Sequence, residues 1–317
     1  MLKSVLRFLL PNFLLPNSAG KHPNRRNSTR KKAWRAIAIG SVLAFTIVAC
    51  SSGSITSQNV AGESAKPDAT APAATAAAGG TLDQILSAGV VKIAVPQDSP
   101  PFGSVGTNGE PQGYDIEVAK LVAESLEVEL ELIPVTSTNR IPYLQTGRAD
   151  LVISSLGATP ERAKSIYFSS IPYAPFFSGI YGPVSQVVAS YEDLANKTVG
   201  VTQGSLEDLE LTDKAPESID VKRFEDNSVT ISALLSNQVE LIATGNTIAG
   251  EVIKNNPDAN IENKFVMKNS PCYIGLRRGD FDMLEWVNVF VRNKRFSGEL
   301  DALSQEWFGE PLEVPSF

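Results

Sequence analysis

The sequence predicts an α/β protein in which helices cover both faces of largely parallel sheets. Strands alternate with helices of about ten residues along the folded part of the chain, as parallel sheets require. The apolar run 151–154 is typical of a strand buried on both faces, and residues 115–126 place apolar side chains at the helical period. The alternation begins again after Pro183, so two α/β units are expected.

Local signals delimit the elements in order. Thr81 as an N-cap and Gly89 as a stop define a first short helix, and the β-branched run 90–95 forms the strand after it. Alternating apolar and acidic residues over 127–132 indicate a half-buried strand. The same reasoning predicts further helices at 115–126, 141–147, 206–211, 228–235 and 281–308, and further strands at 151–154, 198–201, 221–224 and 239–243.

The first 49 residues are basic, whereas the rest of the chain is acidic. Nine basic and no acidic residues precede Cys50, and 19 basic residues face 35 acidic ones after it. The resulting charge of −16 does not favour nucleic acid as a partner. The single histidine, His22, lies in the basic leader, so the body lacks the imidazole of Ser-His-Asp, Cys-His and histidine-zinc sites. We expect neither a metal nor a cofactor.

Residues 30–50 are typical of a secretory signal, because a basic stretch precedes an apolar segment shorter than the ~20 residues that span a membrane. Residues 47–50 (Ile-Val-Ala-Cys) resemble a bacterial lipobox, which implies cleavage before Cys50 and lipidation of that cysteine. We therefore expect a signal peptide with a basic leader at 1–49 and a lipidated flexible tether at 50–80. An uncleaved N-terminal anchor is the alternative.

A cation is predicted at the start of one helix. Thr159 is the expected N-cap and Pro160 the first helical residue, which places Arg162 in the first turn. The helix dipole disfavours a cation there, whereas a bound anion would share the guanidinium and the helix N–H groups. Arg162 is therefore a candidate anion-binding residue. An arginine paired with a nearby glutamate, or simply solvated, is the alternative.

Four segments carry a family resemblance. Residues 113–119 (Gly-Tyr-Asp-Ile-Glu-Val-Ala), 141–151, 159–169 and 307–309 (Trp-Phe-Gly) resemble, in order and spacing, the solute-binding proteins of amino-acid ABC importers. The resemblance implies a periplasmic-binding-protein fold of type II, with two α/β lobes joined by two crossing strands and a ligand cleft between them.

The family fold assigns the chain to two lobes. Lobe 1 would comprise 81–182 plus 277–317, and lobe 2 would comprise 183–276. The lobes would close over the ligand by a hinge motion.

The resemblance also implies roles for residues that follow the strands. Arg162 would bind the ligand carboxylate together with the N–H near Gly157, and Ser155 would bind the ligand ammonium. The N–H groups of Gly204 and Ser205 would reach the carboxylate from lobe 2. Ligands of open α/β sheets bind beyond the carboxyl ends of strands, which agrees with these positions. A tight turn that needs glycine is the alternative for Gly157.

The ammonium site and the side-chain site are less defined. Family members carry an aspartate where this chain has Gly245, so Asn246 or Asp98 would take its place, or ammonium binding would be weaker. A solvated turn residue is the alternative for Asp98. Arg140 is a second cation at the start of a helix. Family members that bind acidic amino acids resemble this chain at that position. A surface arginine is the alternative for Arg140.

The expected function is not enzymatic. The protein would bind a free amino acid in the periplasm or at the extracellular face, anchored to the membrane by lipid, and deliver it to the permease subunits of an ABC importer. Ser99 and Ser137 stand where many members have aromatic residues, so an acidic or neutral polar ligand is expected. An enzyme on the same scaffold, such as a cyclohexadienyl (prephenate or arogenate) dehydratase, is the alternative, with Asp98 or Glu161 as its acid.

Overall fold

The computed structural model describes residues 79–312. The predicted signal peptide, the lipidation at Cys50 and nearly all of the tether lie outside these residues. Within 79–312, no helix is both long enough and apolar enough to cross a membrane.

The first lobe contains a five-stranded sheet in the order β5-β1-β6-β13-β7. Strands β5, β1 and β6 are parallel, and β13 runs antiparallel to both of its neighbours. A small sheet of β2, β3 and β4 follows β1. The strands of the lobe are β1 (Val90–Pro96), β2 (Asp98–Ser99), β3 (Gly103–Val105), β4 (Pro111–Gln112), β5 (Glu129–Val135), β6 (Leu151–Val152), β7 (Ile166–Phe168) and β13 (Gly275–Arg277).

Helices cover both faces of this sheet. The evidence is that alternate residues of β1 belong to two different apolar clusters. Val91, Ile93 and Val95 pack with α1, α2, α8 and α9, whereas Ala94 packs with Leu144 of α3. The helices of the lobe are α1 (Thr81–Ala88), α2 (Tyr114–Leu126), α3 (Arg140–Gln145), α4 (Pro160–Ala163), α8 (Phe281–Phe296) and α9 (Glu299–Phe308).

The second lobe repeats this architecture with a sheet in the order β10-β9-β11-β8-β12. Its strands are β8 (Phe177–Pro183), β9 (Thr198–Thr202), β10 (Asp220–Phe224), β11 (Leu241–Gly245) and β12 (Ile261–Asn269). Its helices are α5 (Leu206–Lys214), α6 (Asn227–Leu235) and α7 (Asn246–Asn255), with 3-10 turns η1 (Glu192–Leu194) and η2 (Pro257–Ala259). Apolar clusters lie on both faces of this sheet as well. The predicted two-lobed α/β fold is confirmed.

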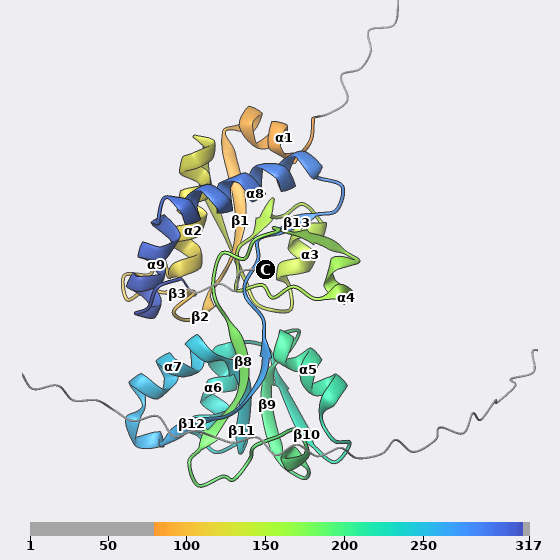
Figure 1. Cartoon of the computed structure of the whole chain (residues 1–317), viewed down its shortest axis with the longest axis vertical. Coiled ribbons are helices and arrows are strands. Elements are labelled where there is room, and N and C mark those ends of the chain that lie inside the picture. The colour runs from red at the N-terminus through yellow and green to blue at the C-terminus, as the bar shows by residue number, and fades with distance from the viewer. Residues whose placement is uncertain (1–78, 313–317) are drawn as a thin grey trace, which may run out of the picture. The chain divides into compact units, whose positions relative to one another are not determined.

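Two strands connect the lobes. Strands β8 and β12 pair antiparallel in the second sheet, and both lead toward the first lobe at the same end (Figure 1). The sequence analysis places the passage of the chain from lobe 1 to lobe 2 after residue 182, and its return to lobe 1 after residue 276. Strand pairing instead places 177–183 in the second sheet and 275–277 in the first. The boundaries differ because an apolar run shows that a strand is buried but does not show which sheet it joins.

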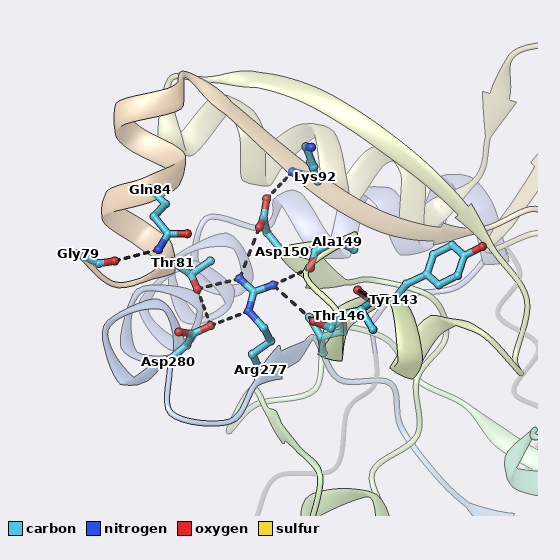
Figure 2. Close-up of polar contacts among 11 residues, drawn as sticks. Gly79, Thr81, Gln84, Lys92, Tyr143, Thr146, Ala149, Asp150, Arg277 and Asp280 are labelled. Carbon is cyan, nitrogen blue, oxygen red and sulfur yellow. Dashed lines mark hydrogen bonds and ion pairs between the residues drawn. The ribbon is translucent and has the colours of Figure 1, made fainter. Parts of the chain in front are cut away.

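Arg277 ties the returning strand β13 to the beginning of the first lobe (Figure 2). Its guanidinium donates hydrogen bonds to the carbonyl of Ala149 and the hydroxyl of Thr81, each at 2.8 Å. It also pairs with Asp280 at 3.3 Å and with Asp150 at 3.5 Å. One side chain therefore joins α1, the loop before β6 and the segment after β13.

Two predicted helix ends are wrong, for local reasons. Thr81 is the first helical residue rather than the N-cap, which is Gly80, and its hydroxyl binds Asp280 instead of the helix backbone. The predicted helix 281–308 is interrupted at Gly298, whose φ of +81° ends α8 and begins α9. The predicted stop at Gly89 is confirmed, with φ of +69°.

Candidate functional site

Arg162 lies between the two lobes, at the start of α4. The hydroxyl of Thr159 accepts a hydrogen bond from the Arg162 N–H at 3.1 Å, which confirms the predicted N-cap. The buried guanidinium donates to the carbonyl of Gly157 at 2.8 Å and, across the lobes, to the carbonyl of Gly204 at 3.1 Å. Burial, reinforced by the nearby charge of Arg140, lowers the pKa of Arg162 to about 9. An anion beside Arg162 would relieve this electrostatic cost.

Arg140 is a second buried cation, at the first residue of α3, and is only 4% exposed. Its Nη1 donates to the carbonyl of Ser154 at 2.6 Å. Its buried Nε has no hydrogen-bond partner among residues 79–312. Burial lowers the pKa of Arg140, and the charge of Glu207 opposes that shift. Arg140 is therefore not a solvated surface residue.

A small cavity is bordered by both lobes, and Arg162 is not among the residues that line it. Four predicted site residues line it, namely Arg140, Ser155, Gly157 and Ser205. The buried hydroxyl of Ser270 also borders it and, like the Arg140 Nε, lacks a partner in the described part of the chain. Because nearly all buried polar groups in proteins form hydrogen bonds, these two atoms point to a ligand.

The cavity has a volume of about 20 Å³, which holds roughly one water molecule. An amino acid can therefore enter only when the lobes separate or the surrounding side chains turn.

Asp115 fixes the loop that borders the cavity. Its fully buried carboxylate accepts hydrogen bonds from the N–H of Ser155 at 2.7 Å and from the hydroxyl of Tyr173 at 2.8 Å. Ser155 has φ of +40°, in the left-handed region that residues other than glycine adopt only when their surroundings impose it. Burial raises the pKa of Asp115 to about 7, although both hydrogen bonds oppose the shift. The Gly-Tyr-Asp segment gave no indication of this role.

The second lobe contributes Glu207, which the sequence analysis did not single out. Glu207 is the second residue of α5, lines the cavity and is 5% exposed. Its Oε1 accepts a hydrogen bond from the hydroxyl of Ser178 at 2.6 Å. Its charge raises the pKa of both Arg140 and Arg162, against the effect of burial. An acid in the first turn of a helix is common because it suits the helix dipole, so the sequence carried no specific signal.

Four predicted site residues do not line the cavity: Arg162 and Gly204, which bind each other across the lobes, and Asp98 and Asn246. Asp98 accepts hydrogen bonds from the N–H and the side-chain amide of Asn227, at 2.8 and 3.3 Å. Asn246 accepts a hydrogen bond from the N–H of Phe177 at 3.0 Å and does not line this cavity. Both side chains serve contacts within the protein, so neither occupies the position expected of an ammonium-binding group.

The turn before α5 also differs from the expectation. The Gly204 N–H donates to the carboxylate of Asp208 at 3.0 Å, and the Ser205 N–H donates to the carbonyl of Thr202 at 3.2 Å. The Ser205 hydroxyl caps α5 by accepting from the Asp208 N–H. These backbone donors are satisfied within their own loop because the turn and its helix cap use them.

Phe176 fills the space next to Gly245, at the end of β11. A Cβ added to Gly245 would lie 2.1 Å from the ring Cζ of Phe176. The ring belongs to an aromatic group with Phe102, at a centroid distance of 5.8 Å. A side chain at position 245 therefore has no room unless Phe176 moves.

Comparisons with known proteins agree with this architecture. The model of the family described as bacterial extracellular solute-binding proteins, family 3, matches residues 91–310. An L-cystine-binding protein of Escherichia coli (strain K12) is 28% identical over 234 residues, which cover 73% of this chain and 86% of that protein.

Two solved structures are also similar. An ancestral arginine-binding protein bound to arginine is 32% identical with a TM-score of 0.66, covering 70% of this chain and 99% of that one. An ancestral amino acid-binding protein, described as a precursor of cyclohexadienyl dehydratase, is 30% identical with a TM-score of 0.66, covering 73% and 100%.

Proposed function

The chain belongs to the bacterial extracellular solute-binding proteins of family 3, and on that basis we propose that it binds an acidic or neutral polar amino acid and delivers it to an ABC importer. Similar proteins are named for cystine and arginine, so membership alone does not select the ligand. The choice of ligand class rests on the cavity.

The observation that carries the proposal is the buried Arg140, which lines the cavity with an unpartnered Nε, together with the buried Arg162, which binds the carbonyl of the lining residue Gly157. Arg162 would bind the α-carboxylate, near Ser155 and Gly157. Arg140 would bind a carboxylate or amide oxygen of the ligand side chain through its unpartnered Nε. A lysine or arginine ligand would bring a third cation into this site, and like charges in a buried site repel strongly. Glutamate, aspartate and glutamine are the ligands that fit best.

A thermal-shift measurement of the purified protein with each of the twenty amino acids tests the ligand class. A ligand at ~100 times its dissociation constant stabilises the fold by ~2.7 kcal/mol. Arg162→Ala should weaken binding by roughly 30-fold to several thousand-fold, since removing one partner of a desolvated charge pair costs ~2–5 kcal/mol. Arg140→Ala should reduce the affinity for glutamate more than the affinity for glutamine. Tight binding of arginine or leucine, without a response to glutamate or glutamine, would refute the proposal.

Membrane attachment is proposed from the sequence alone. Cleavage before Cys50 and lipidation of this residue would hold the protein at the outer side of the cytoplasmic membrane, because two or more acyl chains anchor firmly. Mass spectrometry of the N-terminus of the processed protein tests this. An unmodified Cys50 within an uncleaved chain would contradict it.

The dehydratase alternative has weaker support. The solved structure related to this enzyme is that of an ancestral amino acid-binding protein, described as a precursor of cyclohexadienyl dehydratase. Neither Asp98 nor Glu161 lines the cavity. Turnover of prephenate or arogenate by the purified protein would show that the alternative is correct.

A further inference from the structure

We propose that Glu207 binds the ammonium group of the ligand, and so takes a role for which Gly245, at the end of β11, offers no side chain. This inference rests on the proposed function, because it assigns one more group of an amino-acid ligand to the same cavity.

The position of Glu207 is the first argument. Glu207 borders the cavity from the second lobe, and Ser155 borders it from the first. The hydrogen bond from Ser178 holds Oε1 at 2.6 Å, so the carboxylate is fixed in place. A carboxylate has acceptor sites beyond the one that Ser178 uses, so a carboxylate fixed at the wall of the cavity is well suited to accept from an ammonium group.

The second argument is that the other acidic and amide candidates for the ammonium site already have partners within the protein. Glu207 is the only acidic residue among the described residues that line the cavity. Asp98 is occupied by Asn227, and Asn246 by the backbone of Phe177. The ring of Phe176 fills the space above Gly245.

The third argument is charge complementarity. Arg140 and Glu207 line the cavity, Arg162 binds the carbonyl of the lining residue Gly157, and the charge of Glu207 acts on both arginines. Glutamate and aspartate as ligands carry two carboxylates and one ammonium, which is the opposite pattern. Each charge of such a ligand would therefore meet a partner of opposite sign, as a desolvated charge requires.

Glu207 could instead serve only to neutralise the two arginines, without contacting the ligand. The two roles differ in one observable. A residue that binds the ammonium matters only for ligands that carry one, whereas a residue that neutralises the arginines affects all ligands alike.

The experiment measures ligand affinity by calorimetry for Glu207→Gln and for the wild type. Two pairs of ligands are used: L-glutamate with glutarate, and L-glutamine with glutaramate. The members of each pair differ only in the α-ammonium. Glu210→Gln is the matched control, because Glu210 is on the same helix, is similarly buried and pairs with Lys214 and Lys268 away from the cavity.

We expect Glu207→Gln to reduce the affinity for the amino acid, relative to its deamino analogue, by ~30-fold or more. Glu210→Gln should leave this ratio unchanged. An equal loss for both members of a pair, or no loss, would overturn the inference and leave the proposed function intact. A wild-type protein that binds none of the twenty amino acids would overturn the proposed function, and the inference with it.

Discussion

Asp98 in the first lobe accepts two hydrogen bonds from Asn227 in the second, at 2.8 Å from the backbone N–H and 3.3 Å from the side-chain amide. Asn227 is the first residue of α6, where free N–H groups and the helix dipole favour a carboxylate. The Ser99 hydroxyl accepts a further bond from Asn227 at 2.8 Å. Asp98, one of the residues expected to bind the ligand ammonium, thus forms a contact between the lobes instead.

Removing this carboxylate should favour separation of the lobes. Asp98→Ala loses charge-assisted hydrogen bonds of ~1.5–3 kcal/mol that exist only when the lobes are in contact. We expect about 10-fold weaker amino-acid binding and a larger ligand-free radius of gyration by X-ray scattering. Thr138→Val, which removes a more exposed bond to the Gln203 carbonyl, is the control and should have a smaller effect. Equal scattering and affinity for Asp98→Ala and wild type would contradict this role.

A second prediction compares two glycines of the second lobe. Gly245→Ala places a Cβ 2.1 Å from the Phe176 ring, and overpacking of this kind costs about 1–3 kcal/mol of unfolding free energy. Gly250→Ala on α7 meets nothing within 4 Å and should stabilise the protein by about 0.5–1 kcal/mol. Urea denaturation measures both. A Gly245→Ala protein as stable as Gly250→Ala would show that Phe176 turns away freely.

A third prediction concerns Arg277. Arg277→Met keeps the apolar stem but removes the guanidinium from Asp150, Asp280 and the Ala149 carbonyl. We expect a loss of about 2 kcal/mol in the unfolding free energy, since the site is largely buried and involves charged hydrogen bonds. Arg278→Met is the control, because its bond to the Lys164 carbonyl is exposed, and it should cost less than about 0.5 kcal/mol. Equal stabilities of the two variants would contradict the role of Arg277.

A fourth prediction is a dependence of stability on pH through Asp115. Its pKa of about 7 in the folded protein is above the ordinary value, so folding favours the protonated form. The resulting stability is fully present below pH ~4 and is lost as the pH rises toward 7, at about 1.4 kcal/mol per unit. The stability of wild type relative to Asp115→Asn should therefore fall by roughly 4 kcal/mol between pH 4 and 8. Denaturant titrations at several pH values measure this difference, and one that stays constant with pH would refute the prediction.

Interactions between neighbours in the chain could be predicted from the sequence. Which side chains of one lobe meet those of the other could not. The cap by Thr159 and the place of Arg162 follow from residues that are neighbours in the chain. The partner of Asp98 lies 129 residues away, so its role depends on how the two lobes meet. The role of Glu207 depends in the same way on the residues that face α5. The space above Gly245 could not be inferred either, because the ring that fills it comes from a segment about 70 residues earlier.

The pairing of the strands also sets an order of folding during synthesis. Phe177 and Asn269 are register partners, so all strands of the second sheet lie between these residues and are synthesised before β13. Strand β13 stands between β6 and β7, so the first sheet stays divided until residues 275–277 arrive. The usual order, in which the N-terminal unit folds first, should therefore be reversed. A nascent chain that stops after β12 would carry a folded second lobe and an incomplete first lobe with two exposed strand edges.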